Sequence, residues 1–286
     1  MTYKMRFGVA LLTAFFLLPV FAFAENDNDQ GDGRGSACNG LPTYGKLKEA
    51  LDTAVSQETS GLNLHMWATI VNRDGIVCAI AFSGVERGSQ WPGSRVISAQ
   101  KANTANSFSL DSTSSLSGSG TAFAPLSSPV GLALSTANLY AAVQPGGSLF
   151  GLQESNPVNV AAAYKGPSTN FGQRNDPLVG EKIGGVNVFG GGLAMYAPGK
   201  KLVGGLGLSG DTSCADHMIA WRVRRLLDMD HLLGVFAVSG DNQRPDNIVY
   251  DFTPNLNGVD SHSAGGFGQP TCLFTVSPAA LPVVRN

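Results

Sequence analysis

Charged residues are scarce in this chain of 286 residues. Asp, Glu, Lys and Arg make up only 14% of it, and the formal net charge is −2. Proteins that bind nucleic acids use clustered Lys and Arg to hold phosphates, so this composition argues against a nucleic-acid partner. Long apolar runs are also missing beyond residue 24, and a helix that spans a bilayer needs about 20 apolar residues. The sequence therefore predicts no membrane partner once residues 1–24 are removed.

Residues 1–24 have the pattern of a secretory signal peptide. Lys4 and Arg6 precede an apolar run at 9–23, and the segment ends in Ala-Phe-Ala, which matches an A-x-A cleavage site. Cleavage there predicts an exported protein that begins at Glu25, in the periplasm or in the medium. Both destinations are oxidising enough for disulfide bonds to persist.

The cysteines lack the C-x-x-C spacing of zinc and redox motifs. There are four of them, Cys38, Cys78, Cys214 and Cys272, and export predicts that all four form disulfides. Four cysteines allow three pairings, which sequence cannot distinguish. We favour Cys38–Cys272, which would join the two extensions of the chain, together with Cys78–Cys214 inside the core.

Residues 184–228 are the stretch around which the rest of the chain is organised. They predict a strand, a tight turn at Pro198-Gly199, a second strand at 202–208 and a helix that begins at 211–213. Pro presets the φ angle of the turn, and Gly accepts the positive φ that follows. The unit is therefore a β-hairpin that leads directly into a helix.

One face of this second strand carries almost no side chain. Side chains alternate along a strand, so Gly205 and Gly207 share the face opposite Leu206 and Leu208. A strand this poor in side chains lets another group approach its backbone closely. Two interpretations follow: a helix packs tightly on this face, or a planar ligand lies against it.

The remainder of the chain predicts a mixture of helices and strands. Apolar periodicity and turn signals indicate helices at 44–59 and 94–108 and strands at 62–71, 76–82 and 234–239. Residues 151–180 form a long loop, and such loops in compact domains are often functional. We therefore divide the mature chain into a flexible leader at 25–43, a domain at 44–240 with a loop-rich insertion at 111–183, and a wrapping tail at 241–286.

Several of these residues match the motifs of a known family. Residues 101–105 read Lys-Ala-Asn-Thr-Ala, residues 203–210 read Val-Gly-Gly-Leu-Gly-Leu-Ser-Gly, and Asp216 follows early in the next helix. In these features the chain resembles the GlcG/HbpS-like heme-binding family. The resemblance implies an α+β fold with an antiparallel sheet of about five strands, helices packed against it, long loops and a tail. It also implies heme as the cofactor and assembly into a homo-oligomer.

Heme iron requires an axial His, Cys, Met or Tyr. We favour His217 as the metal ligand, because helical geometry turns it away from the core side of its helix and beside Trp221. The predicted heme site comprises His217, Trp221, Gly205, Gly207, Tyr196 and His65. No C-x-x-C-H motif is present, so covalent attachment of heme is not expected.

Two other functions are consistent with the sequence. The stripe from Cys214 to Trp221 gives its helix a second apolar face, which would suit a non-catalytic oligomeric interaction module without heme. Ser209 and Ser213 near His217 offer the groups of a hydrolase, but the G-x-S-x-G turn of a serine nucleophile is missing. We therefore favour binding over catalysis.

Overall fold

The computed structural model describes residues 35–111, 131–253 and 262–286. The predicted signal peptide and the first part of the leader lie outside the described residues. None of the helices within the described ranges is long and apolar enough to cross a membrane.

A four-stranded antiparallel sheet forms the centre of the fold. Its strand order is β2-β1-β5-β4, with β1 at Trp67–Asn72, β2 at Val77–Phe82, β4 at Gly192–Ala197 and β5 at Lys201–Ser209. The expected α+β fold is thereby confirmed. The sheet has four strands rather than about five, because only β6 (Phe236–Ala237) forms in the segment 234–239, and it pairs in parallel with β3 (Leu132–Ala133).

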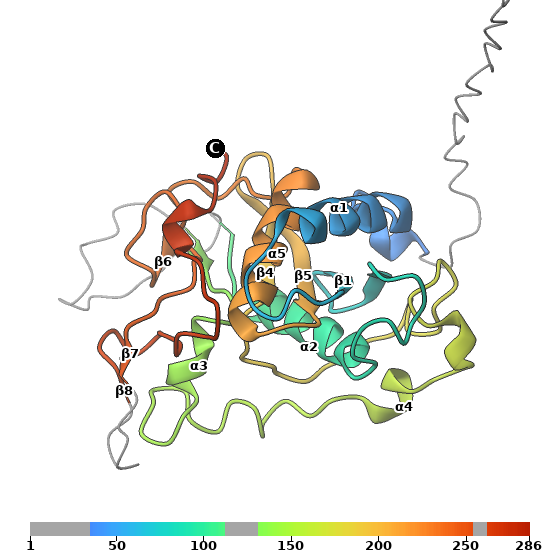
Figure 1. Cartoon of the computed structure of the whole chain (residues 1–286), viewed down its shortest axis with the longest axis horizontal. Coiled ribbons are helices and arrows are strands. Elements are labelled where there is room, and N and C mark those ends of the chain that lie inside the picture. Colours follow the sequence, from blue (N-terminus) through green and yellow to red (C-terminus); the bar gives the residue numbers. More distant parts are fainter. Residues whose placement is uncertain (1–34, 112–130, 254–261) are drawn as a thin grey trace, which may run out of the picture. The chain divides into compact units, whose positions relative to one another are not determined.

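Three helices of 14 residues cover the sheet on both faces. Helix α2 (Ser94–Ser107) lies on one face, and α1 (Tyr44–Gln57) and α5 (Ser213–Leu226) lie on the other (Figure 1). The Thr43 side chain caps α1 and the Thr212 side chain caps α5, each by accepting a hydrogen bond from the first turn. The two helices therefore start at residues whose polar oxygens satisfy otherwise unpaired N–H groups.

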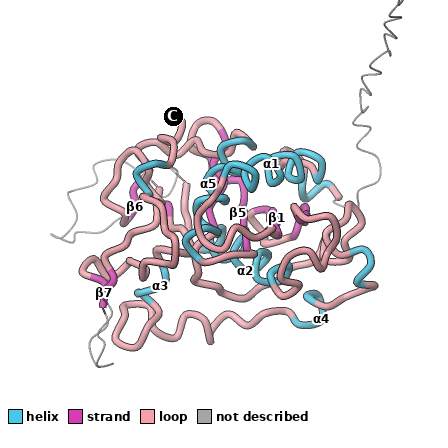
Figure 2. The backbone as a smooth tube through the Cα atoms, in the orientation of Figure 1, coloured by secondary structure: helices cyan, strands magenta, loops and turns pink. Residues whose placement is uncertain are grey.

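The remaining elements are short. They are α3 (Leu139–Ala142), α4 (Val160–Ala163), the 3-10 turns at Ser36–Cys38, Ser168–Asn170 and Pro278–Ala280, and a hairpin of β7 (Phe252–Thr253) with β8 (His262–Ser263). Figure 2 shows that loops connect most of them. The loop after α4 is held to α2 by the buried ion pair between Arg95 and Asp176, so this long excursion is fixed on the body of the fold.

The glycine face of β5 packs directly on the backbone of α2. A Cβ atom on Gly205 would lie 2.1 Å from the carbonyl oxygen of Ala102, and one on Gly207 would lie 2.0 Å from that of Ser98. The helix interpretation is therefore confirmed. The alternative of a planar ligand on Gly205 and Gly207 is wrong, because α2 fills the space that the missing side chains create.

The disulfide pairing differs from the one we favoured. All four cysteines are bonded as expected, but Cys38 pairs with Cys78 and Cys214 pairs with Cys272, at Cα–Cα distances of 5.6 and 5.9 Å. The reason is that the leader packs beside the sheet, where Cys38 reaches Cys78 in β2, and the tail packs on α5, where Cys272 reaches Cys214. The leader is held beside the β1–β2 hairpin, where Asn72 donates a hydrogen bond to Ala37, and the tail returns to the start of α5.

Replacing Gly207 by Ala tests the contact between β5 and α2. Because the new methyl group would meet helix backbone, we expect the Gly207→Ala variant to lose about 1–3 kcal/mol or more of unfolding free energy in urea titrations. Gly45 in α1 is the matched control, since its nearest neighbour would lie 4.0 Å away and Gly→Ala in a helix gains about 0.5–1 kcal/mol. Equal stability of the Gly207→Ala variant and the wild type would contradict this packing.

Candidate functional site

His217 and Trp221 lie side by side, as expected, but neither reaches solvent. Their ring centroids are 5.9 Å apart, and the two side chains are 0% and 1% exposed. The tail covers them: the Ile248 N–H lies 3.2 Å from His217 Nε2, and Trp221 Nε1 donates to the Pro282 carbonyl at 3.0 Å. The prediction of His217 as an iron ligand is therefore wrong, because the chain's own tail fills the position that a ligand would need.

The other predicted heme residues do not join His217. Tyr196 is buried, and its hydroxyl lies 3.0 Å from the carbonyl oxygens of both Leu110 and Leu132; burial raises the pKa of its phenol above the ordinary range. His65 is exposed, with Nδ1 at 3.1 Å from Ser83 Oγ. Among these described residues no hydrogen bond or ring contact connects the three, so they do not form one site.

The family motif residues Lys101 and Asp216 form a buried ion pair. Lys101 Nζ lies 2.6 Å from the Asp216 carboxylate and 3.0 Å from the Leu208 carbonyl oxygen, while Asp216 also accepts from the Asp211 N–H at 2.9 Å. Burial lowers the pKa of Lys101 and raises the pKa of Asp216 to about 6. This network joins α2, β5 and α5, so the motif has a structural role here.

The serines considered for hydrolysis have other partners. Ser209 Oγ donates to Ser94 Oγ at 3.1 Å, and Ser213 Oγ accepts from the Gly190 N–H at 2.8 Å. His217 contacts Asn247 instead, at 3.3 Å. These described groups therefore do not form the hydrogen-bonded Ser–His pair that a triad requires.

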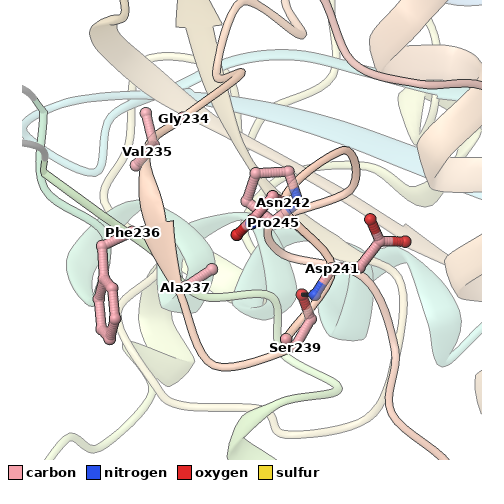
Figure 3. Close-up of a pocket in the computed structure, with 9 residues that line it drawn as sticks. Gly234, Val235, Phe236, Ala237, Ser239, Asp241, Asn242 and Pro245 are labelled. Atoms are coloured by element: carbon pink, nitrogen blue, oxygen red, sulfur yellow. Dashed lines mark hydrogen bonds between the residues drawn. The ribbon is translucent and has the colours of Figure 1, made fainter. Parts of the chain in front are cut away.

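A first pocket, shown in Figure 3, is built from the single segment 234–245 and has a volume of about 340 Å³. Polar side chains of this segment form hydrogen bonds and an ion pair within the segment. Ser239 Oγ donates to the Arg244 carbonyl, and Asp241 forms an ion pair with Arg244 at 3.1 Å. A second pocket of about 420 Å³ includes Phe252 and His262, which flank residues outside the described ranges. The Ser239 and Asp241 side chains of the first pocket are therefore engaged within it, and the second pocket borders residues outside the described ranges.

A third pocket of about 290 Å³ lies at the beginning of α2 and has a mainly apolar lining. We call it the α2 pocket. Its lining residues are Trp67, Arg87, Pro92, Gly93, Arg95, Val96, Tyr164, Ser168 and Phe171. They come from β1, from the loop before α2, from α2 itself and from the long loop after α4. The loop 151–180 that the sequence marks as functional thus supplies three of these side chains.

The inner wall of the α2 pocket is rigid. The Arg95 guanidinium lies 3.7 Å from the centre of the Phe171 ring, and its Nε donates to Asp176 at 2.8 Å. Trp67 packs edge-on against Phe82, with ring centroids 5.2 Å apart, and its buried Nε1 has no hydrogen-bond partner. Two aromatic side chains and a neutralised Arg therefore form a preformed apolar surface.

The mouth of the α2 pocket carries a free cation and a phenol. Arg87 is exposed, and no residue of the described ranges forms an ion pair with it. The side chain of Tyr164 is 68% exposed, and Trp91, next to Pro92, is 51% exposed. An apolar pocket that is lined by the Tyr164 ring and by a guanidinium without an ion-pair partner among the described residues suits a flat organic anion. The sequence signal for it is weak, since its residues are scattered and follow no motif.

The fold defines an α+β protein with helices on both faces of an antiparallel sheet. A family model described as haem degrading protein HbpS-like matches residues 46–224. This chain therefore belongs to the HbpS-like family. The network of Lys101 and Asp216 lies inside the matched region, whereas the tail that covers His217 lies outside it.

Several solved structures are similar to the chain at low identity. Klebsiella pneumoniae protein ORFY shares 21% identity over 64% of this chain and 86% of its own, with a TM-score of 0.39. The structure of a PduOC:heme complex shares 21% identity over 65% and 94%, with a TM-score of 0.40. A double mutant of HbpS from Streptomyces reticuli shares 16% identity over 65% and 87%, with a TM-score of 0.38. No curated protein matches the chain.

The buried His217 makes stability depend on pH. Burial lowers its pKa from 6.5 to about 4, so the unfolded chain takes up this proton at a higher pH than the native chain. The resulting stability is fully present above pH 6.5 and is lost as the pH falls towards 4, with a slope of up to about 1.4 kcal/mol per pH unit.

The His217→Gln variant isolates this effect, because Gln keeps an acceptor for the Ile248 N–H but does not titrate. We expect the stability difference between wild type and variant, measured in urea at stepped pH, to shrink steadily from pH 6.5 to 4. A difference that stays constant over this range would contradict the buried neutral imidazole. The comparison cancels other titrating groups, including Asp216.

Proposed function

We propose that this protein binds heme, and that the α2 pocket and its mouth hold the porphyrin. The observation that carries the proposal is the pocket itself, with an apolar aromatic wall beside a guanidinium that has no partner among the described residues. A porphyrin presents a flat apolar ring and two carboxylates, which need an apolar surface and a cation. Membership of the HbpS-like family and the heme complex of one similar protein support the same ligand.

The residues present fit this ligand in type and position. Val96, Pro92 and the Phe171 ring offer apolar contacts, and Arg87 offers two N–H donors for a carboxylate. A pocket of about 290 Å³ takes one edge of a porphyrin and leaves the other edge in solvent. Heme supplies an iron centre when bound; the chain supplies the apolar surface, the cation and a nearby phenol.

Export belongs to the same proposal. Residues 1–24 carry the signal pattern, and the two disulfides are of the kind that persists outside the cytoplasm. An exported heme binder meets its ligand outside the cell interior. N-terminal sequencing of the exported protein should start at Glu25.

Titration with hemin tests heme binding directly. We expect a shifted Soret band with wild-type protein and weaker binding by Arg87→Glu, about 3- to 10-fold, because the charge that meets the carboxylates is reversed. Arg174→Glu is the matched control, since Arg174 is exposed but lies over the Tyr44 ring rather than in the pocket. An unchanged hemin spectrum with wild-type protein would reject the proposal.

A second candidate function is self-assembly through an apolar turn. The sequence predicted that the second apolar face of α5, from Cys214 to Trp221, would contact another copy. This prediction is wrong, because the tail covers that face. Another surface replaces it: Leu273 and Phe274 are 59% and 67% exposed, and the Gly61 N–H donates to the Phe274 carbonyl, which brings Leu62, 45% exposed, into the same neighbourhood.

The double variant Leu273→Ser, Phe274→Ser tests this surface. If the turn forms a contact between copies, the variant should have a lower mass in light scattering than the wild type at equal concentration. Leu226→Ser is the control, since Leu226 is 50% exposed at the end of α5. A wild type that remains monomeric would reject assembly through this turn.

A further inference from the structure

Most groups that can bind heme iron are engaged elsewhere in the described part of the chain. All four cysteines form disulfides, and the described methionines lie in or against the main core. His217 is buried, and His231 contacts the Asn286 carbonyl at 2.8 Å and Asp228 at 3.3 Å. None of the four histidines lines the α2 pocket. Among the residue types that ligate heme iron, the pocket lining contains only a tyrosine.

Hydrogen bonds fix the backbone next to that tyrosine, Tyr164, whereas its side chain is exposed. It follows α4, and its neighbour Ala163 accepts a hydrogen bond from Arg95 Nη1 at 2.8 Å. Asn159 caps the start of α4 by accepting from the Ala162 N–H at 3.2 Å. Within the described residues, no group forms a hydrogen bond with the Tyr164 hydroxyl. The phenol is therefore exposed and has no hydrogen-bond partner among the described residues, while hydrogen bonds hold the backbone next to it.

Resting on the proposed function, we propose that Tyr164 is the residue that would hold the heme iron in the α2 pocket and would make the site selective for ferric heme. On binding, the Tyr164 O–H bond would break, the proton would pass to solvent, and the phenolate oxygen would serve as the iron ligand. No electron is transferred in this step. An anionic oxygen is a hard donor, so it favours the ferric over the ferrous state.

The position of Arg87 fits this assignment. Both side chains line the same pocket and both are exposed. One cation and one phenol at the mouth of the pocket would fix a porphyrin by its carboxylates and by its metal at once. The phenol therefore distinguishes iron porphyrin from the metal-free ring, which Arg87 and the aromatic wall hold equally well.

The test compares hemin with metal-free protoporphyrin IX, using full-length mature protein. Hemin binding is followed by the Soret band and by the phenolate-to-iron charge-transfer band, and porphyrin binding by quenching of tryptophan fluorescence. Loss of groups that merely orient a metal ligand costs about 10–100-fold in affinity, so Tyr164→Phe should weaken hemin binding by at least about tenfold. It should abolish the charge-transfer band and leave protoporphyrin IX binding unchanged.

Three further variants complete the design. Tyr164→His should restore tight hemin binding with the spectrum of a nitrogen ligand. Tyr140→Phe is the matched control, because Tyr140 packs against Phe252 and lies outside the α2 pocket. Reduction of bound hemin by dithionite should weaken its binding to wild-type protein but not to the Tyr164→His variant. His65→Ala should bind hemin as the wild type does.

The outcomes separate the two proposals. If wild-type protein binds hemin and Tyr164→Phe binds it equally, with the same spectrum, Tyr164 is not the ligand, whereas heme binding stands. Loss of hemin binding in His65→Ala instead of Tyr164→Phe would also overturn the assignment. If wild-type protein binds neither hemin nor protoporphyrin IX, both proposals fall.

Discussion

The close contact between α2 and the glycine face of β5 is the constraint on which the rest of the structure depends. Because Gly205 and Gly207 carry no side chain, the helix backbone approaches the strand more closely than any Cβ would permit. At this distance Lys101 reaches across to Asp216 on α5 and to the Leu208 carbonyl. The same contact fixes α2, whose first turn supplies Arg95 and Val96 to the lining of the α2 pocket.

A second constraint comes from the tail, which changes what α5 can do. The buried ion pair between Arg224 and Asp246 holds the beginning of this segment, and the Cys214–Cys272 disulfide holds its return. The tail covers His217 at Ile248 and Trp221 at Pro282, and this burial keeps the imidazole neutral at ordinary pH. The face of α5 that carries His217 and Trp221 was predicted to bind a ligand, but the tail makes it part of the protein interior.

The residues that carry the family motifs and the residues that line the α2 pocket have different roles. The motif residues explain the packing of two helices on a sheet, and none of them lines any of the three pockets described above. The α2 pocket takes its walls from β1 and α2 and also from loops: Arg87 comes from the loop before α2, and Tyr164 and Phe171 come from the long excursion. The residues on which the proposed heme site depends therefore lie outside the motifs.

The family resemblance of the motifs implied the α+β class. The sequence by itself determined the positions of α1, α2 and α5, the two strands at 62–71 and 76–82 and the engagement of all four cysteines. These follow from periodicity, turn chemistry and compartment, which act over a few residues or on the whole composition. Tertiary structure alone decided the disulfide partners, the burial of His217 and the meeting of Arg87 with Tyr164. Such contacts join residues far apart in the chain, and their formation depends on which surfaces pack together once the hydrophobic core has closed.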